Sequence, residues 1–338
     1  MAIATNTRTT YGANGIREAL SNIIYNISPM DTPFLSGAGK GSCDNTLFEW
    51  QTDSLADAAA NQQLEGDDSM DALAVSEPRR LQNYAQISYK AVQTSGTAEA
   101  VDFAGRRSSQ AYQLAKRAKE IKRDMEKMLL SNDVAVAGAA GTARKTAAVM
   151  SWLGTTAAGT SNVILGSASP VVGIVNNGTG SPAPGPDGTT TIAGFGTPAV
   201  LTMAMINLAM ERCFTLGGEP STVLAPATLK QKISSLGGSV IADIQKDAPG
   251  TAQATAINAV DVLVTDFGTL KIIPSRLMLA NMLFFVDYDF WSVDYLRPFQ
   301  TENLAKTGDA MKQLMIAEYG LRAKNGLANA AIVGVKDA

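Results

Sequence analysis

Residues 37–42 combine three glycines with one lysine, in the sequence Gly-Ala-Gly-Lys-Gly-Ser. In phosphate-binding loops, glycine amides and a lysine ammonium group surround the phosphate oxygens. A complete loop would have glycine where this chain has Phe34, and the sequence predicts neither a strand before the segment nor a helix after it. A phosphate-binding enzyme is therefore kept only as a remote alternative.

A second group of residues is acidic and could hold a hard cation. Glu65, Asp67, Asp68 and Asp71 lie close together in a polar stretch, and calcium prefers several carboxylate oxygens as ligands. Their spacing does not match the helix-loop-helix calcium pattern. The ordinary interpretation is an acidic, solvated loop, so we predict no metal site.

A third group, Asp287, Asp289 and Asp294, could supply the paired acids of a hydrolase. Alternation along a strand exposes aspartates without any chemistry, however, and we assign them no catalytic role. The chain contains no histidine, which removes the commonest general base and transition-metal ligand. The sequence predicts no enzyme, no catalytic residue and no cofactor.

Composition indicates a folded protein with a sizeable core. The chain has 338 residues, 46% of them hydrophobic, and a net charge of −3, which argues against sequence-specific nucleic-acid binding. Cys43 and Cys213 have no metal-ligand spacing and fit a reduced compartment, with a single disulfide as the alternative. No signal peptide or membrane-spanning run is present in the sequence.

The region 46–130 is the most informative for architecture. In 46–53, Phe48 and Trp50 alternate with polar residues, which predicts a half-buried strand. We interpret 81–94 as the single return strand of a hairpin, with 54–80 as its long acidic tip. An isolated two-stranded hairpin is marginal in water, and a loop of this length is uncommon inside a domain. The hairpin is therefore expected to lie on another subunit.

Residues 96–130 are predicted to form one charged helix of about nine turns, roughly 50 Å long. Leu114, Ala118, Ile121, Met125 and Met128 recur at steps of three and four and form one apolar stripe. Basic residues cover the other faces. A nucleic-acid-binding rod is one interpretation, but three acids interrupt the basic surface, which favours ion pairs with a protein partner. The acids concerned are Glu120, Asp124 and Glu126.

The rest of the chain is predicted to be an α+β lobe with a central sheet. Residues 134–202 are rich in Ala, Gly, Ser and Thr and are interpreted as a surface insertion. Periodicity and turn residues then predict helices and strands in succession. These are a helix over 201–214, a strand over 221–225, a helix from Pro226 through Leu236, and strands over 261–265, 269–273 and 282–286.

Near the C-terminus, the aromatic run 284–296 is interpreted as one strand with a bulge. Residues 311–323 alternate in a way that suits a strand as well as a short helix, and 330–335 are predicted to be a last strand. At the other end, 16–27 could form a short amphipathic helix. The first fifteen residues have a composition that needs an external partner to order it.

The order of arm, long hairpin, long charged helix, α+β lobe and returning aromatic strand resembles the major capsid protein of tailed bacteriophages, the Hong Kong 97-type fold. Local sequence agrees over essentially the whole chain except 134–202. The matching segments are 23–34 (IIYNISPMDTPF), 48–55 (FEWQTDSL), Asn61 with Glu65-Gly66, 92–97 (VQTSGT) and 119–126 (KEIKRDME).

This resemblance implies a division of the chain into five parts. It would have an N-terminal arm over 1–43, an extended loop over 44–94, a spine helix over 95–134, an axial domain over 135–283, and a return to the peripheral domain over 284–338. The implied function is structural: self-assembly into an icosahedral virion head around double-stranded DNA, contacted non-specifically. An encapsulin-type compartment of the same fold is the alternative.

The resemblance also implies partners. These are copies of the chain itself in hexamers and pentamers, a scaffolding protein during assembly in the bacterial host cytoplasm, a portal protein and an optional decoration protein, with no membrane. The absence of a coiled-coil leader predicts a separate scaffolding protein, and no covalent cross-link is expected. We predict inter-subunit ion pairs between the acidic loop tip and basic residues of a neighbour. The residues concerned are Glu65, Asp67, Asp68, Asp71, Arg79, Arg80, Arg106, Arg107, Lys116 and Arg117.

Overall fold

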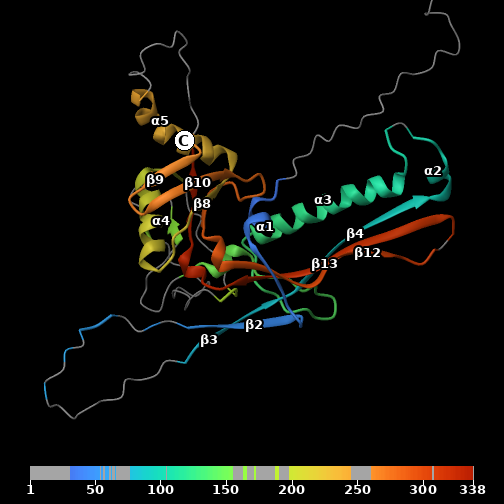
Figure 1. The fold of residues 1–338 in the computed structure, drawn as a ribbon, viewed down its shortest axis with the longest axis horizontal. Coiled ribbons are helices and arrows are strands. Elements are labelled where there is room, and N and C mark those ends of the chain that lie inside the picture. The colour runs from blue at the N-terminus through green and yellow to red at the C-terminus, as the bar shows by residue number, and fades with distance from the viewer. Residues whose placement is uncertain are drawn as a thin grey trace, which may run out of the picture.

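The computed structural model describes most of the chain from residue 31 onward. The described residues are 31–53, 55, 58–60, 62, 65, 77–103, 105–154, 163–165, 171–172, 187–189, 198–244, 260–306 and 308–337. The fold is α+β and is built on two sheets, one of four strands and one of seven, with separate two-stranded ladders beside them (Figure 1).

The seven-stranded sheet forms the centre of one lobe and mixes parallel with antiparallel pairs. Its members, in spatial order, are β6 (Val171–Val172), β5 (Val163–Leu165), β14 (Ala330–Val333), β11 (Met282–Val286), β8 (Thr222–Ala225), β10 (Gly268–Pro274) and β9 (Val262–Thr265). Helices α4 (Met203–Thr215) and α5 (Ala227–Ile244) pack against it. The remaining short pair joins β7 (Ala199–Val200) to β15 (Val335–Lys336).

The four-stranded sheet is long and carries the principal helix along one face (Figure 1). Its strands, in spatial order, are β1 (Gly39–Ser42), β12 (Trp291–Asn303), β13 (Ala310–Ala323) and β4 (Gln86–Ser95). The helix, α3 (Ser109–Leu129), buries Ile121 and Met125 of the predicted apolar stripe, and Leu129 is buried where the prediction had Met128. Leu114, Ala118 and Met128 are half-buried. The strand interpretation of 311–323 is thus correct.

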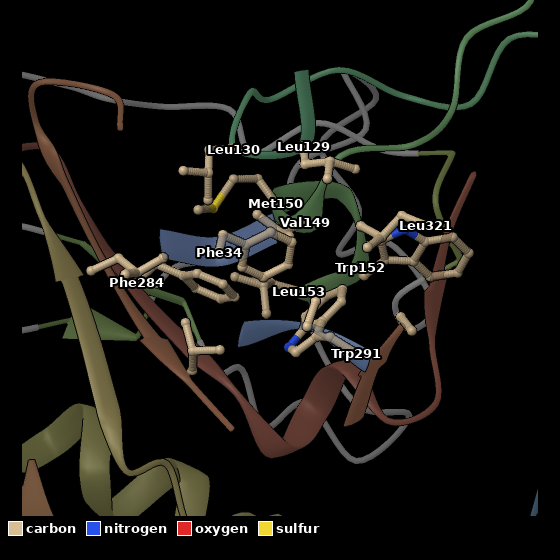
Figure 2. Packing of buried hydrophobic residues seen from close by; sticks show 14 of the residues in the cluster. Phe34, Leu129, Leu130, Val149, Met150, Trp152, Leu153, Phe284, Trp291 and Leu321 are labelled. Atoms are coloured by element: carbon tan, nitrogen blue, oxygen red, sulfur yellow. The ribbon is translucent and has the colours of Figure 1, made fainter. Parts of the chain in front are cut away.

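One hydrophobic core joins the two sheets. Figure 2 shows Phe34 from the short helix α1 (Pro33–Gly37) among Leu129, Phe284 and Trp291, which come from α3, β11 and β12. The centroid of the Phe34 ring lies 6.0 Å from that of Trp291 and 6.2 Å from that of Phe284. Side chains from both sheets interleave in this cluster, while a second core lies between the seven-stranded sheet and helices α4 and α5.

The prediction of one nine-turn helix over 96–130 is wrong. The structure has α2 (Gly96–Ala100), then a non-helical connection, then α3. In that connection Gly105 adopts a positive φ of 77°, which a helix cannot accommodate. Ser108 caps α3 by accepting from the Ala111 amide, and Glu99 accepts from the amides of Ser109 and Gln110. These side chains satisfy the first amides of a new helix, and α3 is about 32 Å long.

The prediction of one return strand over 81–94 is also wrong. The hairpin ladder pairs β2 (Leu47–Thr52) with β3 (Arg79–Tyr84), whereas β4 pairs with β13 in the other sheet. The chain changes sheets at the fully buried Ala85, whose amide donates to Thr46 O. Asn83 fixes the change of sheets by donating to Leu321 O at 2.6 Å and accepting from the Ala147 amide.

The interpretation of 134–202 as a surface insertion is wrong for its first part. Residues 147–150, 152 and 153 are buried, and Trp152 is only 1% exposed. Figure 2 shows Val149, Met150, Trp152 and Leu153 at the centre of the shared core. This stretch is uncharged because it forms the interior.

The aromatic run 284–296 is likewise two strands in two sheets and not one bulged strand. β11 ends at Val286, a 3₁₀ turn over Tyr288–Phe290 follows, and β12 begins at Trp291. Asp287 accepts from the Asp289 amide and so caps this turn. The change of face near Trp291 marks the passage from one sheet to the other. Register irregularities do occur within β12, between Tyr295 and Gln300.

The predicted helix over 16–27 and the first fifteen residues lie outside the described residues. Cys43 and Cys213 are buried free thiols, and burial raises the pKa of Cys43 to about 11. In the described part of the chain, no helix is long and apolar enough to cross a membrane.

Candidate assembly surface

The glycine-rich segment 37–42 offers no place for a phosphate group. It forms the end of α1 and strand β1, which pairs in parallel with β12. The Asp294 carboxylate lies directly against the backbone of Gly41, where even a methyl group would collide with it. A buried carboxylate repels phosphate, so this segment is a packed strand and not an anion site.

The aspartates of the C-terminal half also have structural partners. Asp287 caps the 3₁₀ turn, and the Asp294 carboxylate, on a residue that is 1% exposed, pairs with Arg322 at 2.5 Å. Among the described residues, no group of three or more acidic, cysteine or histidine side chains could hold a metal ion. Of the acidic loop residues, Glu65 is exposed, and Asp67, Asp68 and Asp71 lie outside the described residues.

The hairpin β2–β3 stands apart from both large sheets and is fixed at its base (Figure 1). Trp50 Nε1 donates to Ala323 O at 2.8 Å, and the centroid of its ring lies 5.3 Å from that of Trp152 and 5.7 Å from that of Phe48. Just beyond the ladder, Leu55 is 97% exposed. The base is therefore rigidly held, while an apolar side chain further out has no cover within the described part of the subunit.

The basic residues on the hairpin are accessible. Arg79 and Arg80 are both exposed on β3, and Arg80 pairs with Glu49 across the ladder. This pair is solvent-exposed, and such pairs contribute only about 0.2 to 1 kcal/mol. Both guanidinium groups are thus positioned on the hairpin, with one of them already engaged within the chain.

The basic residues predicted near the principal helix have different environments. The Arg106 guanidinium lies 4.1 Å from the Phe103 ring centre and 5.8 Å from that of Tyr112. Arg107 and Lys116 are exposed. Arg117 pairs with Glu120 on the same helix at 2.5 Å. The structure thus brings the four predicted residues to one end of α3 but leaves only Arg107 and Lys116 of this group exposed.

Sequence reasoning identified Glu126 only as an acid on the helix surface and missed that it joins the principal helix to α1. Its carboxylate is fully buried and accepts from the amides of Phe34 at 2.9 Å and Leu35 at 2.7 Å. Burial raises the pKa of Glu126, although these amides oppose the shift. Burial, with the Glu126 charge second, raises the pKa of Tyr288 to about 12. Glu126 therefore fixes α1 to the principal helix.

Sequence reasoning also missed Glu318, a buried carboxylate between two arginines. It accepts from Arg297 Nε at 2.9 Å and pairs with Arg144, whose Nε donates to Ala85 O at 3.2 Å. These contacts tie the loop after α3 to β12, β13 and the point where the chain changes sheets. No sequence signal identifies such a cluster, because the three charged residues do not share one local pattern.

Among solved structures, the Cyanophage A-1(L) capsid asymmetric unit aligns with a TM-score of 0.65 and 12% identity, covering 95% of this chain and 97% of that one. The capsid of the native GTA particle aligns at 0.61 with 12% identity, covering 98% and 99%. The SrpI encapsulin from Synechococcus elongatus PCC 7942 aligns at 0.50, also with 12% identity, covering 96% and 94%. The fold is therefore the Hong Kong 97-type capsid fold.

Sequence comparison then gives the family. The model of the SU10 major capsid protein family matches residues 3–336. The major capsid protein of Escherichia phage Phieco32 is 30% identical over 355 residues, covering 96% of this chain and 95% of the relative. The chain belongs to the SU10 major capsid protein family, as a structural protein of a tailed phage and not an enzyme. This membership decides against the encapsulin and phosphate-enzyme alternatives.

Proposed function

We propose that the chain assembles as hexamers and pentamers into an icosahedral head that encloses double-stranded DNA. The observation that carries this proposal is the β2–β3 hairpin. Its ladder pairs only with itself among the described strands, is fixed at Trp50 and leads to the exposed Leu55 beyond the body. Such a hairpin gains stability when a second surface covers it, and in a shell built from copies of this chain that surface is a neighbouring subunit.

The five-part division predicted from the sequence is proposed with two refined boundaries. β11 and β14 pair within the seven-stranded sheet, so we assign residues 282–286 and 330–336 to the axial domain. The peripheral domain then comprises α2, α3, β4, β12 and β13, because these form or cover the four-stranded sheet. The arm comprises the residues up to Cys43, and the extended loop is the β2–β3 hairpin with its tip.

The ion pairs between subunits are proposed to join the acidic loop tip of one copy to Arg107 and Lys116 of the next. Both cations are exposed and have no ion-pair partner among the described residues. Within the chain, Arg106 packs on aromatic rings and Arg117 pairs with Glu120. These two residues would therefore attract the acidic tip through their positive charge without forming direct ion pairs with it. Arg79 and Arg80 are proposed to lie at the edge of the same contact.

The remaining partners follow from the role in the head. We propose that a separate scaffolding protein guides assembly in the bacterial host cytoplasm, that a portal protein occupies one vertex, and that a decoration protein is an optional addition. Double-stranded DNA would be contacted without sequence specificity. The modest net charge of −3 supports this, because a strongly basic lining would hold packaged DNA in place.

The function is tested by electron microscopy of particles formed by the full-length chain with its scaffolding protein. We expect closed shells in which each hairpin lies on a neighbouring subunit. Leu55→Asp should sharply reduce the particle yield while leaving the unassembled chain folded. The control, Val264→Asp, makes the same kind of change at an exposed apolar residue on β9 of the seven-stranded sheet and should assemble normally. A hairpin that touches only its own chain would refute the proposed arrangement.

A further inference from the structure

One face of α3 presents a row of cations. Lys119, Arg123 and Lys127 follow one another at intervals of four residues, which places them on the same face over about 12 Å. Lys119 and Lys127 are exposed, and Arg123 is half-buried. Within the described part of the chain, none of the three forms an ion pair. We call these residues the α3 basic row.

The acids that interrupt this surface in the sequence are all engaged elsewhere. Glu120 pairs with Arg117 on its own helix, and Asp124 pairs with Lys90 on β4 at 2.6 Å. Glu126 is buried and accepts the two amides of α1. The carboxylates therefore neutralise other groups, and the main argument from the sequence against a polyanion-binding helix no longer holds.

The neighbouring cation, Lys122, is also accounted for, because its ammonium group lies 5.9 Å from the Phe299 ring centre on β12. The α3 basic row is thus distinct from the side of the helix that packs on the sheet. It is held on a rigid helix of 21 residues, whose buried stripe fixes its orientation. A fixed row of like charges whose neighbouring carboxylates, Glu120 and Asp124, are paired with other cations is complementary to a regular polyanion.

We propose that the α3 basic row contacts the phosphate groups of double-stranded DNA inside the head, an inference that rests on the proposed function. Three cations on one straight face fit a continuous line of phosphates better than they fit a short acidic loop. The row itself contains no aromatic side chain, so base stacking contributes nothing and the contact is independent of sequence. Each subunit supplies a weak contact, and the shell repeats it.

The test measures binding of a fluorescently labelled DNA duplex to the unassembled full-length chain by anisotropy over a range of salt concentrations. Each phosphate contact contributes a slope of about −0.9 in log K against log salt, so the wild type should give about −2.7 for three contacts. The variant K119Q/R123Q/K127Q should lose most of this slope and about tenfold in affinity at low salt.

The matched control, K271Q/K306Q/K336Q, removes the same charge from exposed lysines elsewhere and should bind like the wild type. Equal losses in both triple variants would show a net-charge effect and overturn the proposal. The conservative variant K119R/R123K/K127R should retain binding, and its failure to do so would also overturn the proposal, since the charge is unchanged.

Particle yield separates this inference from the proposed function. The α3 basic-row variant keeps Lys116, the residue of α3 that is proposed to meet the acidic loop tip of a neighbour, so it should still form shells. Unchanged DNA binding with loss of particles would reassign the row to an acidic surface of a neighbouring copy and refute the DNA contact. Failure of the wild type itself to form particles would refute the proposed function instead.

Discussion

Glu126 is the residue whose surroundings are least like those of an ordinary surface carboxylate. It is fully buried, accepts two backbone amides from α1, and has no basic partner among the described residues. A buried charge without a counter-ion is costly unless hydrogen bonds compensate it. These two amides supply that compensation, and their hydrogen bonds connect the principal helix to α1.

The raised pKa of Glu126 gives a pH dependence of definite sign. Burial lifts the pKa above its ordinary value of 4.5, so the folded state binds the proton more tightly than the unfolded state. The resulting stabilisation is fully present below the unfolded pKa and is lost as pH rises through the folded pKa. We expect the stability advantage of the wild type over Glu126→Gln to shrink as pH rises from 4.5 toward neutral.

Urea unfolding of the unassembled chain at a series of pH values measures this difference. Glu302→Gln removes an exposed carboxylate on β12 and serves as the control for the loss of one acidic group. The expected result is a pH-dependent gap for Glu126→Gln that the control lacks. A constant gap across the range would mean that Glu126 titrates alike in the folded and unfolded chain.

At the scale of elements, the break between α2 and α3 depends on side-chain caps. Ser108 accepts from the Ala111 amide, and removing such a cap costs about 1 kcal/mol. Ser108→Ala should therefore lower the free energy of unfolding by about that amount. Thr202 stands at the same position before α4 but makes no side-chain cap bond, so Thr202→Ala should cost clearly less. Equal losses in urea unfolding would contradict this role for Ser108.

Sequence patterns predicted the elements that are regular over their whole length. The alternation in 46–53 gave strand β2, and helical spacing gave α4, which is followed by Gly217 with a positive φ of 81°. The apolar stripe of α3 was correct at Ile121 and Met125, whereas Leu129 is buried in place of Met128. In each case one face is buried along most of the element, so a single periodicity describes it.

The same reasoning failed where one continuous pattern spans two elements. Helical periodicity in the sequence continues past α2, but Gly105 with its positive φ interrupts the helix, and the bonds of Glu99 and Ser108 begin a new one. Alternation likewise runs past Ala85, although the chain changes sheets there. The point at which the chain changes sheets depends on hydrogen bonds of Asn83 and Arg144, whose partners lie more than 50 residues away. Such tertiary bonds leave no local pattern in the sequence.

The candidate contact residues show the same limit. Composition identified the acidic tip and the basic helix, but it could not tell which cations are engaged within the chain. Arg117 is engaged by Glu120 and Arg106 by aromatic rings, while Lys116 is exposed. Burial of carboxylates such as Glu126 depends on the tertiary structure alone. A predicted charge surface therefore needs its internal ion pairs assigned before partners can be inferred.

At the scale of the whole molecule, the N-terminal arm should be required for assembly and not for folding. Residues 1–15 have few large apolar side chains, and the described core that closes over α1 begins only at Phe34. Deleting residues 1–15 should leave the unassembled chain soluble with unchanged urea unfolding, but it should reduce particle yield. Normal particles from the truncated chain would show that the arm is dispensable.

Ion pairs repeated across the whole shell should affect how well the particles assemble. The acidic tip, with Asp67 and Asp68, is proposed to face Arg107 and Lys116 of a neighbour. Individual exposed pairs contribute only about 0.2 to 1 kcal/mol, but a closed shell repeats each contact many times. Asp67→Lys with Asp68→Lys should therefore reduce particle yield most at low salt, where screening is weakest.

Adding Arg107→Glu and Lys116→Glu to this loop reversal restores opposite charges across the proposed contact. The combined variant should recover part of the lost particle yield if the loop tip meets these two residues of a neighbour. Combining the loop reversal with Lys271→Glu and Lys306→Glu places the same charge elsewhere and should recover nothing. Electron microscopy counts of closed particles across a salt series provide the measurement. An unchanged yield for the loop reversal at low salt would leave the hairpin held by shape and by apolar contacts such as Leu55 alone.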